Sequence, residues 1–369
     1  MSKAIEQVQT KHVQTVGSGS YLPADVSFLL RQVDLSPTDV TEKERLIQTN
    51  KRHYSEMISH ENPPSATHMD LYARALDQNG ERMARDVQAL ALALNQAYTG
   101  PTIALVSFVR AGLPLGVLLR RVLIDMGREA EHYGISIIRD RGIDVVALET
   151  VIKTHGAENI VFVDGWTGKG AISGEIRRSL AGDNRFPVDP RLVVLADPCG
   201  KAWLAASFED WIIPSGILGA TVSGLVSRSI WPKDGGMHGC VVYDHLREHD
   251  VTQSFVDHIH TQARALTSVV AAQPWTEEQA GLLQADALSV VANLAERFSI
   301  TNLNRVKPGI AEATRAVLRR VPDHVLVRNR DDQDVQLLMH LTKQAGIEVE
   351  EAGEALGPYR AVTIIRSVN

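Results

Sequence analysis

Residues 160 to 163 form a short apolar stretch that ends on an acid, Asp164, and leads into a glycine-rich turn. The β-branched and aromatic residues of this stretch are typical of a buried parallel strand. Beyond the turn, apolar residues recur at helical spacing from residue 172 to residue 180. Backbone N–H groups at a helix N-terminus attract a phosphate, so the turn predicts a phosphate site. Its residues would be Thr167, Gly168, Lys169, Gly170 and Ala171.

The spacing of the glycines excludes two common phosphate loops. A Walker loop has the pattern G-x-x-x-x-G-K-[ST], but Gly165 and Gly168 are too close together and Gly170 stands where the hydroxyl residue belongs. The glycines also miss the dinucleotide pattern G-x-G-x-x-G. A purely structural interpretation stays open, because glycine suits a tight connection between a strand and a helix.

Other residues could complete a pocket around this turn. Arg110, Ala111 and Gly112 follow a predicted strand at residues 102 to 108, and Arg110 could bind a pyrophosphate group there. Further candidates for the pocket have a structural alternative, which is that the side chain is exposed to solvent or packed inside the protein. These candidates lie at predicted strand ends, at a polar helix end and in a small-residue segment: Arg139, Asp140, Arg141, Trp166, Arg52, His53, Tyr54, Ser223 and Arg228.

The two cysteines, Cys199 and Cys240, allow a different chemistry. A cysteine hydrolase needs a thiolate with a base and an orienting group within hydrogen-bond reach. If residues 238 to 244 form a strand, His238 and Cys240 share a face, because side chains alternate along a strand. The structural alternative is that each cysteine is a buried packing residue.

Several stretches resemble a phosphoribosyltransferase-like family linked with tellurite-resistance and stress operons. They are GSYLPADVSFLL, KRHYSEMIS, RAGLPLGVLLRR, SIIRDRGID, FVDGWTGKGAI, IPSGILGATVSGLVSR and HGCVVYDHL, within a match over about residues 18 to 369. Members of this family are also catalogued as the cysteine protease StiP family. The segment from residue 322 to residue 369 resembles the Pelota-type RNA-binding fold.

The resemblance implies an enzyme that binds phosphoribosyl pyrophosphate, or a related ribose phosphate or nucleotide, with Mg²⁺. Arg110 and Asp164 would be catalytic: Arg110 would stabilise the departing pyrophosphate, and Asp164 would hold the metal and the ribose hydroxyls. Asp164 stands alone where such enzymes usually carry two adjacent acids. Two alternatives stay open. One is a cysteine protease or hydrolase that uses Cys199 or Cys240 with His238, and the other is an RNA- or nucleotide-binding stress-response protein without transferase activity.

Strands and helices alternate between residues 102 and 196, which predicts an α/β fold with a mostly parallel sheet. The resemblance makes this a sheet of the type I phosphoribosyltransferase kind, with a helical linker and a small C-terminal α/β domain. Capping boxes predict helices at residues 41 to 58, from Thr41 and Glu44, and at residues 276 to 298, from Thr276 and Gln279. The expected domains are an N-terminal extension (1–64), a phosphoribosyltransferase-like domain (65–265), a helical linker (266–321) and a Pelota-like domain (322–369).

Composition limits the partners of the 369-residue chain. A net charge of −6 argues against a protein that coats nucleic acid. Residues 322 to 369 carry five Lys and Arg against eight acids, so this segment offers little support for RNA contact. Arginines and Pro114 interrupt the most apolar stretch, and two cysteines give no disulfide framework, so we expect a cytoplasmic protein without a membrane partner. The oligomeric state is open, with a homo-oligomer among the options.

Overall fold

The computed structural model describes residues 15–367, and its centre is a sheet of six parallel strands. The strands lie in the order β1 (Ser27–Phe28), β4 (Ala130–Ile135), β3 (Ile103–Phe108), β7 (Ile160–Val163), β8 (Leu192–Ala196) and β9 (Leu204–Ser207). Every pairing in this sheet is parallel. The α/β class, the mostly parallel sheet and the small C-terminal domain are confirmed. A kinship with the type I phosphoribosyltransferase fold stays a prediction.

Helices cover both faces of this sheet, because alternate side chains of each strand point to opposite faces. On β3, Ile103 and Leu105 pack with α2 (Ala66–Ala97), α3 (Leu113–Asp125) and α7 (Thr252–Ala265). The intervening Ala104 and Val106 pack with α4 (Val145–His155) and α5 (Ala171–Ser179). In the described residues no helix is long and apolar enough to cross a membrane.

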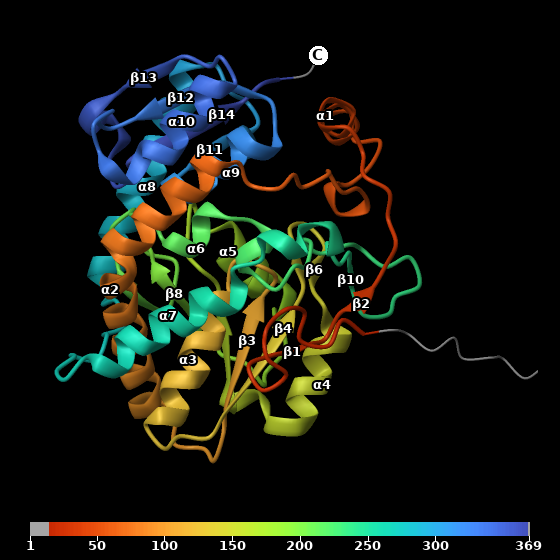
Figure 1. Ribbon diagram of the computed structural model, residues 1–369, viewed down its shortest axis with the longest axis vertical. Coiled ribbons are helices and arrows are strands. Elements are labelled where there is room, and N and C mark those ends of the chain that lie inside the picture. Colours follow the sequence, from red (N-terminus) through yellow and green to blue (C-terminus); the bar gives the residue numbers. More distant parts are fainter. Residues whose placement is uncertain (1–14, 368–369) are drawn as a thin grey trace, which may run out of the picture.

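A second, four-stranded sheet forms a C-terminal unit above the carboxyl ends of the central strands (Figure 1). Its order is β11 (Val306–Pro308), β14 (Ala361–Ile365), β12 (Pro322–Val327) and β13 (Val349–Glu351). Helices α8 (Glu277–Arg297), α9 (Ile310–Arg319) and α10 (Gln336–Gln344) belong with it. The capping box of Thr276 and Gln279 is confirmed at the start of α8. The predicted boundary at residue 322 falls inside this unit, since β11 pairs with β14.

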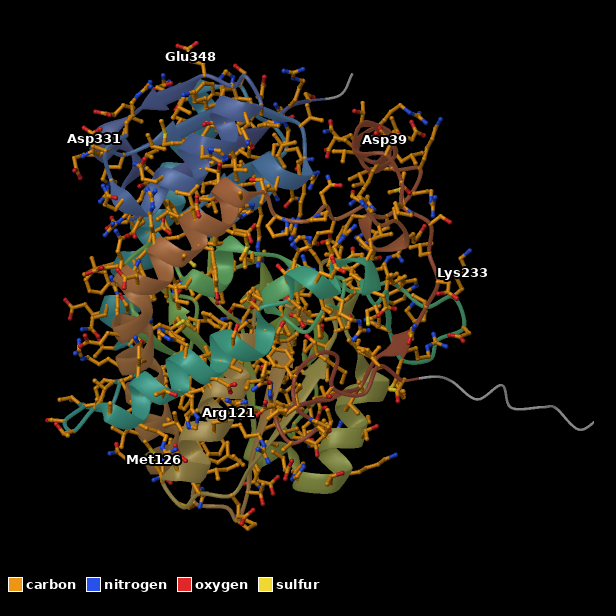
Figure 2. The ribbon with its side chains drawn as sticks, in the orientation of Figure 1. Asp39, Arg121, Met126, Lys233, Asp331 and Glu348 are labelled. Carbon is orange, nitrogen blue, oxygen red and sulfur yellow. The ribbon has the colours of Figure 1, made fainter. Side chains whose placement is uncertain are left out.

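The N-terminal segment runs beside both units. Its strand β2 (Arg31–Gln32) pairs with β10 (Gly239–Cys240), and α1 (Val40–Gln48) lies next to the C-terminal unit (Figure 1). The predicted helix from residue 41 to residue 58 is wrong, because α1 ends at Gln48. Its N-cap is Asp39 (labelled in Figure 2) rather than Thr41. The Asp39 carboxylate accepts the N–H groups of Thr41 and Glu42.

The remaining elements are short. They are β5 (Ile137–Ile138), β6 (Gly142–Ile143), α6 (Pro214–Ile217), and the 3₁₀ helices η1 (Tyr54–Glu56), η2 (Ala157–Asn159), η3 (Ala220–Val222), η4 (Asp244–His249), η5 (Leu303–Arg305), η6 (Gln333–Val335) and η7 (Gly353–Leu356).

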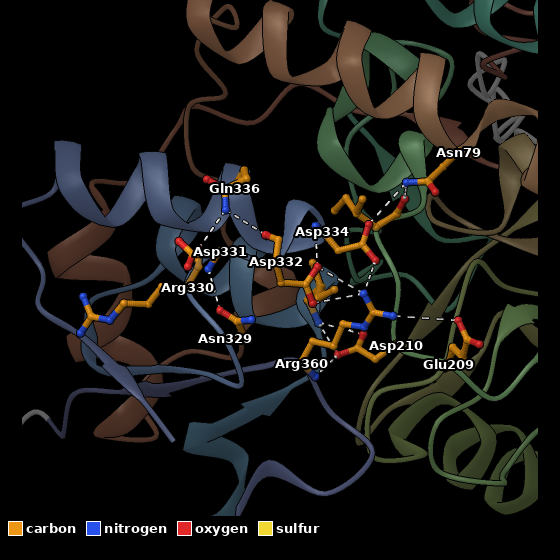
Figure 3. A network of polar contacts seen from close by, with 12 residues as sticks. Asn79, Glu209, Asp210, Asn329, Arg330, Asp331, Asp332, Asp334, Gln336 and Arg360 are labelled. Atoms are coloured by element: carbon orange, nitrogen blue, oxygen red, sulfur yellow. Dashed lines mark hydrogen bonds and ion pairs between the residues drawn. The ribbon is translucent and has the colours of Figure 1, made fainter. Parts of the chain in front are cut away.

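A network of polar contacts ties the C-terminal unit to the central one (Figure 3). The buried Asp210, which follows β9, accepts the N–H of Ile310 at 3.0 Å and the N–H of Arg360 at 2.8 Å. The Arg360 guanidinium binds Asp332 and Asp334. One central carboxylate thus caps α9 and holds the loop before β14.

Candidate functional site

A pocket of about 340 Å³ lies between the central sheet and the C-terminal unit. Residues that follow β3, β5 and β7 line one side, and β11 and α9 line the other. Lys43 of α1 reaches the same space. The carboxyl ends of parallel strands are the usual place for ligands in such sheets, so the topology explains the position of the pocket.

Positive charge dominates the lining. Among residues 15–367, two carboxylic acids line the pocket, Asp164 and Glu312. The nine basic residues are Lys43, Arg110, Arg139, Lys169, Arg228, Lys307, Arg315, Arg319 and Arg320.

The predicted phosphate turn lines the pocket over residues 166 to 171. Gly170 has a left-handed φ of 79° and is the N-cap of α5, as a strand-to-helix turn requires. The Thr167 hydroxyl, which the sequence predicts to face a phosphate, instead donates to Asp197. The Lys169 ammonium group is engaged by the carbonyl oxygens of Leu303 and Val306. The turn is therefore partly occupied by the protein's own contacts.

Asp164 is buried at the end of β7 and accepts the N–H of Gly165 at 2.8 Å. Burial raises the pKa of this carboxyl group to about 7, although the Gly165 N–H and Arg315 offset part of the effect. The residues present suit Mg²⁺ poorly, because the acids among the described lining residues are Asp164 and Glu312 alone, beside nine basic residues. Within residues 15–367 no three His, Cys, Asp or Glu side chains gather as metal ligands. Magnesium therefore stays a prediction that rests on the sequence.

Arg110, predicted to bind pyrophosphate, has protein partners on both of its terminal nitrogens. Its Nη2 lies 2.6 Å from Oε2 of Glu61, and its Nη1 donates to the Val226 carbonyl at 2.9 Å. Burial alone would raise the pKa of Glu61, but Arg110 and Arg319 outweigh it and hold that pKa at about 2. The Arg110–Glu61 pair is thus ionised, and Arg110 is fixed by the fold.

The other predicted pocket residues divide into two groups. Ala111, Arg139, Trp166, Tyr54 and Arg228 line the pocket. Six predicted residues do not line it: Gly112, Asp140, Arg141, Arg52, His53 and Ser223.

Local contacts explain why these six lie elsewhere. Arg141 pairs with Glu56, and Asp140, in a turn with a φ of 67°, donates its N–H to the Glu175 carboxylate. His53 caps η1, and Arg52 donates to the Glu56 carbonyl. The Ser223 hydroxyl donates to the carbonyl of Gly219, and Gly112 packs against the backbone of β7.

Sequence reasoning missed the cations that α1, β11 and α9 contribute, namely Lys43, Lys307, Arg315, Arg319 and Arg320. The spacing TRAVLRR in α9 places three arginines within two turns, and this was the one available signal. For Lys43 and Lys307 nothing in the sequence points to a buried position. Burial and neighbouring arginines lower the pKa of each of these lysines to about 7.

Cys199 lies directly behind the wall of the pocket, in the loop after β8. Its Sγ donates to Oγ1 of the pocket residue Thr167 at 3.2 Å and lies 3.6 Å from Oδ1 of Asp197. The side chain is 2% exposed, covered by residues of α8 and by Tyr359. Burial, followed by the charge of Asp197, raises the pKa of this thiol well above its usual range.

Cys240 lies in β10, away from the pocket, and is fully buried among apolar residues. Burial raises the pKa of its thiol to about 12. The His238 ring, the predicted base, instead bonds through Nδ1 to the Ser136 hydroxyl at 2.5 Å. Within residues 15–367 no histidine ring nitrogen is hydrogen-bonded to either sulfur. The expected pair of His238 and Cys240 is therefore not formed in this conformation.

Comparison with known proteins identifies relatives over nearly the whole chain. Residues 19–260 match a family model described as "Tellurite-like stress resistance cysteine protease StiP", and residues 285–367 match the "PELOTA RNA binding domain". The chain is 51% identical over 364 residues to a protein of Acinetobacter baylyi (strain ATCC 33305 / BD413 / ADP1) named "Cysteine protease StiP". That match covers 95% of this chain and 94% of the relative.

These matches correct the main expectation drawn from the sequence. The predicted phosphoribosyltransferase activity is wrong by this comparison, because both the family and the relative are named as cysteine proteases. The expected StiP family and Pelota-like C-terminal segment are confirmed. The strand, the acid and the glycine turn from which a transferase was predicted are present in the structure. They form a connection between a strand and a helix, which does not by itself identify a reaction.

Proposed function

Since this chain belongs to the tellurite-like stress resistance cysteine protease StiP family, we propose that it is a cysteine hydrolase whose nucleophile is Cys199. The position of the sulfur carries this choice. The Cys199 Sγ contacts a residue of the pocket wall and a carboxylate, whereas Cys240 lies in a strand among apolar side chains. A nucleophile beyond the carboxyl end of a strand is also where α/β enzymes place reacting groups.

In such a reaction the sulfur attacks the carbonyl carbon of a peptide bond, the amine leaves with a proton, and water releases the acyl group from the sulfur. Cys199 is protonated in the described conformation, so it must first lose its proton. Asp197 is a weak acceptor for that proton, because four other donors already bind its carboxylate: the Thr167 hydroxyl, the N–H groups of Lys201 and Ala202, and the Trp275 ring. We therefore propose that this conformation is latent and that activity requires the cover over Cys199 to move.

Helix α8 and the loop of residues 200 and 201, to which it is hydrogen-bonded, cover Cys199. Gln284 of α8 donates to the Gly200 carbonyl at 2.8 Å and accepts from the Lys201 ammonium at 2.5 Å. The apolar side of α8 closes over the sulfur through Ala287 and Val291. Displacing α8 would expose the thiol to water and to substrate.

Cys199→Ser tests the assignment, with Cys240→Ser as the matched control. We expect cleavage of an unfolded protein substrate to be abolished in the Cys199 variant and retained in the Cys240 variant, because only the first removes the attacking sulfur. Fluorescent casein provides the cleavage assay, and thermal unfolding of each variant checks that it is folded. Cleavage by both variants at the rate of the unchanged chain, or loss of cleavage only in Cys240→Ser, would exclude Cys199 as the nucleophile.

One observation favours contact with RNA, and another argues against it. The match of residues 285–367 to the RNA-binding domain model favours it. The placement of the basic residues in that range argues against it, because Lys307, Arg315 and Arg319 line the internal pocket. Residues 322 to 369 are acidic in balance, as the sequence already indicates. An RNA contact therefore stays secondary to the hydrolase proposal.

A further inference from the structure

The cationic pocket contains more positive charge than the protein itself neutralises. Of its nine basic residues, Arg110, Arg319 and Arg320 form ion pairs with carboxylates, to Glu61 or Glu44. Within residues 15–367 the other six form no ion pair. Four of these six bond to neutral oxygens of the protein: Lys43, Arg139, Lys169 and Arg228.

Lys307 and Arg315 have neither kind of partner in the described part of the chain. The Lys307 side chain is 7% exposed and lines the pocket. The Arg315 guanidinium lies 4.5 Å from the centre of the Trp166 ring, and its buried Nε makes no hydrogen bond. A buried charge without a partner is unfavourable, and both side chains line the pocket, so an anion bound there would supply the missing partner.

The cations also repel one another. Lys307 faces Arg139, Lys169 and Arg320, and the acid opposite it is Glu312. Lys43 faces Arg228, Arg320 and Arg319. Burial and these neighbours lower the pKa of both lysines to about 7, so the fold disfavours their charged forms. An anion in the pocket would remove this repulsion.

We propose that the pocket binds a compact anion with three or more negative charges, of the kind that linked phosphate groups provide. The enclosed volume of about 340 Å³ is at the small end for ligand sites, which favours a short chain of phosphates over a polymer. The planar forks of Arg139, Arg228 and Arg315 suit phosphate oxygens. The anion would join α1, the central strand ends and α9, three regions that are distant in the sequence. Anion binding does not require hydrolase activity, because neither cysteine lines the pocket, although Cys199 contacts the lining residue Thr167 from behind.

Inorganic tripolyphosphate is the probe, titrated into the full chain by isothermal calorimetry at pH 7 and constant ionic strength. We expect one saturable site, with affinity at least about tenfold above that for orthophosphate. Lys307→Met and Arg315→Gln should each weaken binding by about tenfold or more, the loss expected for one charge-assisted hydrogen bond. Lys343→Met is the matched control and should bind as the unchanged chain does, because Lys343 is exposed on α10 outside the pocket.

Thermal unfolding separates a binding role from a structural one. Tripolyphosphate should raise the Tm of the unchanged chain. Lys307→Met should raise the Tm of the ligand-free chain, because repulsion falls, and should reduce the rise caused by the ligand. Where Lys307→Met does not fold, Arg315→Gln decides by the same measurements. A titration with ATP distinguishes a free phosphate chain from one carried by a nucleoside, and saturable binding of either supports the proposal.

Three results would overturn it. The first is the absence of saturable binding of both tripolyphosphate and ATP to the unchanged chain. The second is equal binding by Lys307→Met, Arg315→Gln and Lys343→Met. The third is a tetraglutamate peptide or a single-stranded RNA that binds more tightly than tripolyphosphate, which would assign the pocket to an acidic peptide or to nucleic acid.

Discussion

The fold changes the protonation of Asp164 from what its residue type alone would suggest. From the sequence it is a carboxylate at a strand end, which suits a metal or a sugar hydroxyl. In the structure it is buried among aliphatic strands, with one N–H donor and Arg315 nearby, and half of its population is protonated near pH 7. The sequence placed this residue in the pocket because a strand end followed by a turn is a local pattern. Its charge depends on packing from α9, more than a hundred residues away, so the charge could not be predicted.

Asp164→Asn should change how stability depends on pH. The pKa of Asp164 is about 7 in the folded chain and 3.8 by the reference for an unfolded chain, so the folded chain holds this proton more tightly. Its contribution to the free energy of unfolding is fully present below pH 3.8 and is lost as the pH rises through 7. The loss is on the order of 2–4 kcal/mol, and Asp164→Asn should not show it.

Urea unfolding of both chains at pH values below and above this window measures the difference. The stability of Asp164→Asn relative to the unchanged chain should increase from the acid to the neutral side. Asp331→Asn serves as the control, since Asp331 is exposed at the edge of the C-terminal unit (Figure 2). A stability difference that stays constant with pH would contradict the buried, half-neutral state of Asp164.

Arg110 and Thr167 illustrate the same limit for polar side chains. Both lie in the pocket wall, as their positions after strands predict. Their partners, Glu61 and Asp197, come from other parts of the chain. Which partner satisfies a buried donor is decided by tertiary contacts, and a single sequence carries little information about those.

Among the elements, the long helix α8 was predictable, and the bounds of α1 and of the strand around Cys240 were not. Helix α8 follows from its capping box of Thr276 and Gln279. The start of α1 was predicted two residues late, because Asp39 competes successfully with Thr41 for the free N–H groups. The expected strand at residues 238 to 244 is reduced to Gly239–Cys240, which pairs with the short β2 and, through a single bridge, with Ile230.

Helix α8 controls access to Cys199 if the latent state is correct, and Gln284→Ala tests this. The change removes two hydrogen bonds to the loop of residues 200 and 201, each worth about 0.5–1.5 kcal/mol. Local opening should then become roughly fivefold more frequent or greater. We expect iodoacetamide to modify Cys199 faster by that factor, measured in a Cys240→Ser background so that one thiol reports.

Ser289→Ala on the exposed side of α8 is the control, because its hydroxyl bonds only within the helix, to Asp286. This variant should leave the alkylation rate unchanged. If Gln284→Ala reacts at the original rate while its free energy of unfolding falls, the sulfur is reached by some route other than displacement of α8.

At the scale of the whole molecule, the alternation of strands and helices was enough to predict the parallel sheet, and strand ends were enough to predict one wall of the pocket. The opposite wall was not predictable. It comes from α1 and α9, which the sequence assigned to an extension and a linker. Their role depends on how the C-terminal unit docks, and that docking is fixed by scattered contacts such as Asp210 with the N–H of Ile310 (Figure 3).

Asp210→Ala should loosen this docking. The change leaves the buried N–H groups of Ile310 and Arg360 without an acceptor, and each unsatisfied donor costs about 1–3 kcal/mol. The free energy of unfolding should fall by about 2–6 kcal/mol, measured in urea. Limited proteolysis should also cut first between the two units.

Asp210→Asn provides the comparison, because its amide oxygen can still accept one of the two N–H groups. It should recover part of the lost stability. Equal stability of Asp210→Ala and the unchanged chain would mean that the docking does not depend on this carboxylate.

Helix α9 is part of the C-terminal unit and also lines the pocket. This double role restricts how the molecule can evolve. One side of the helix packs Ile310 and Ala313 into the hydrophobic core, where the Thr363 hydroxyl also donates to the Ala313 carbonyl. The other side brings Arg315 and Arg319 to the pocket. A chimera that took its C-terminal unit from a relative would therefore import four of the nine basic residues of the pocket, those from position 307 to position 320. Ligand preference would be inherited with the appended domain, and the two halves of the chain must diverge together.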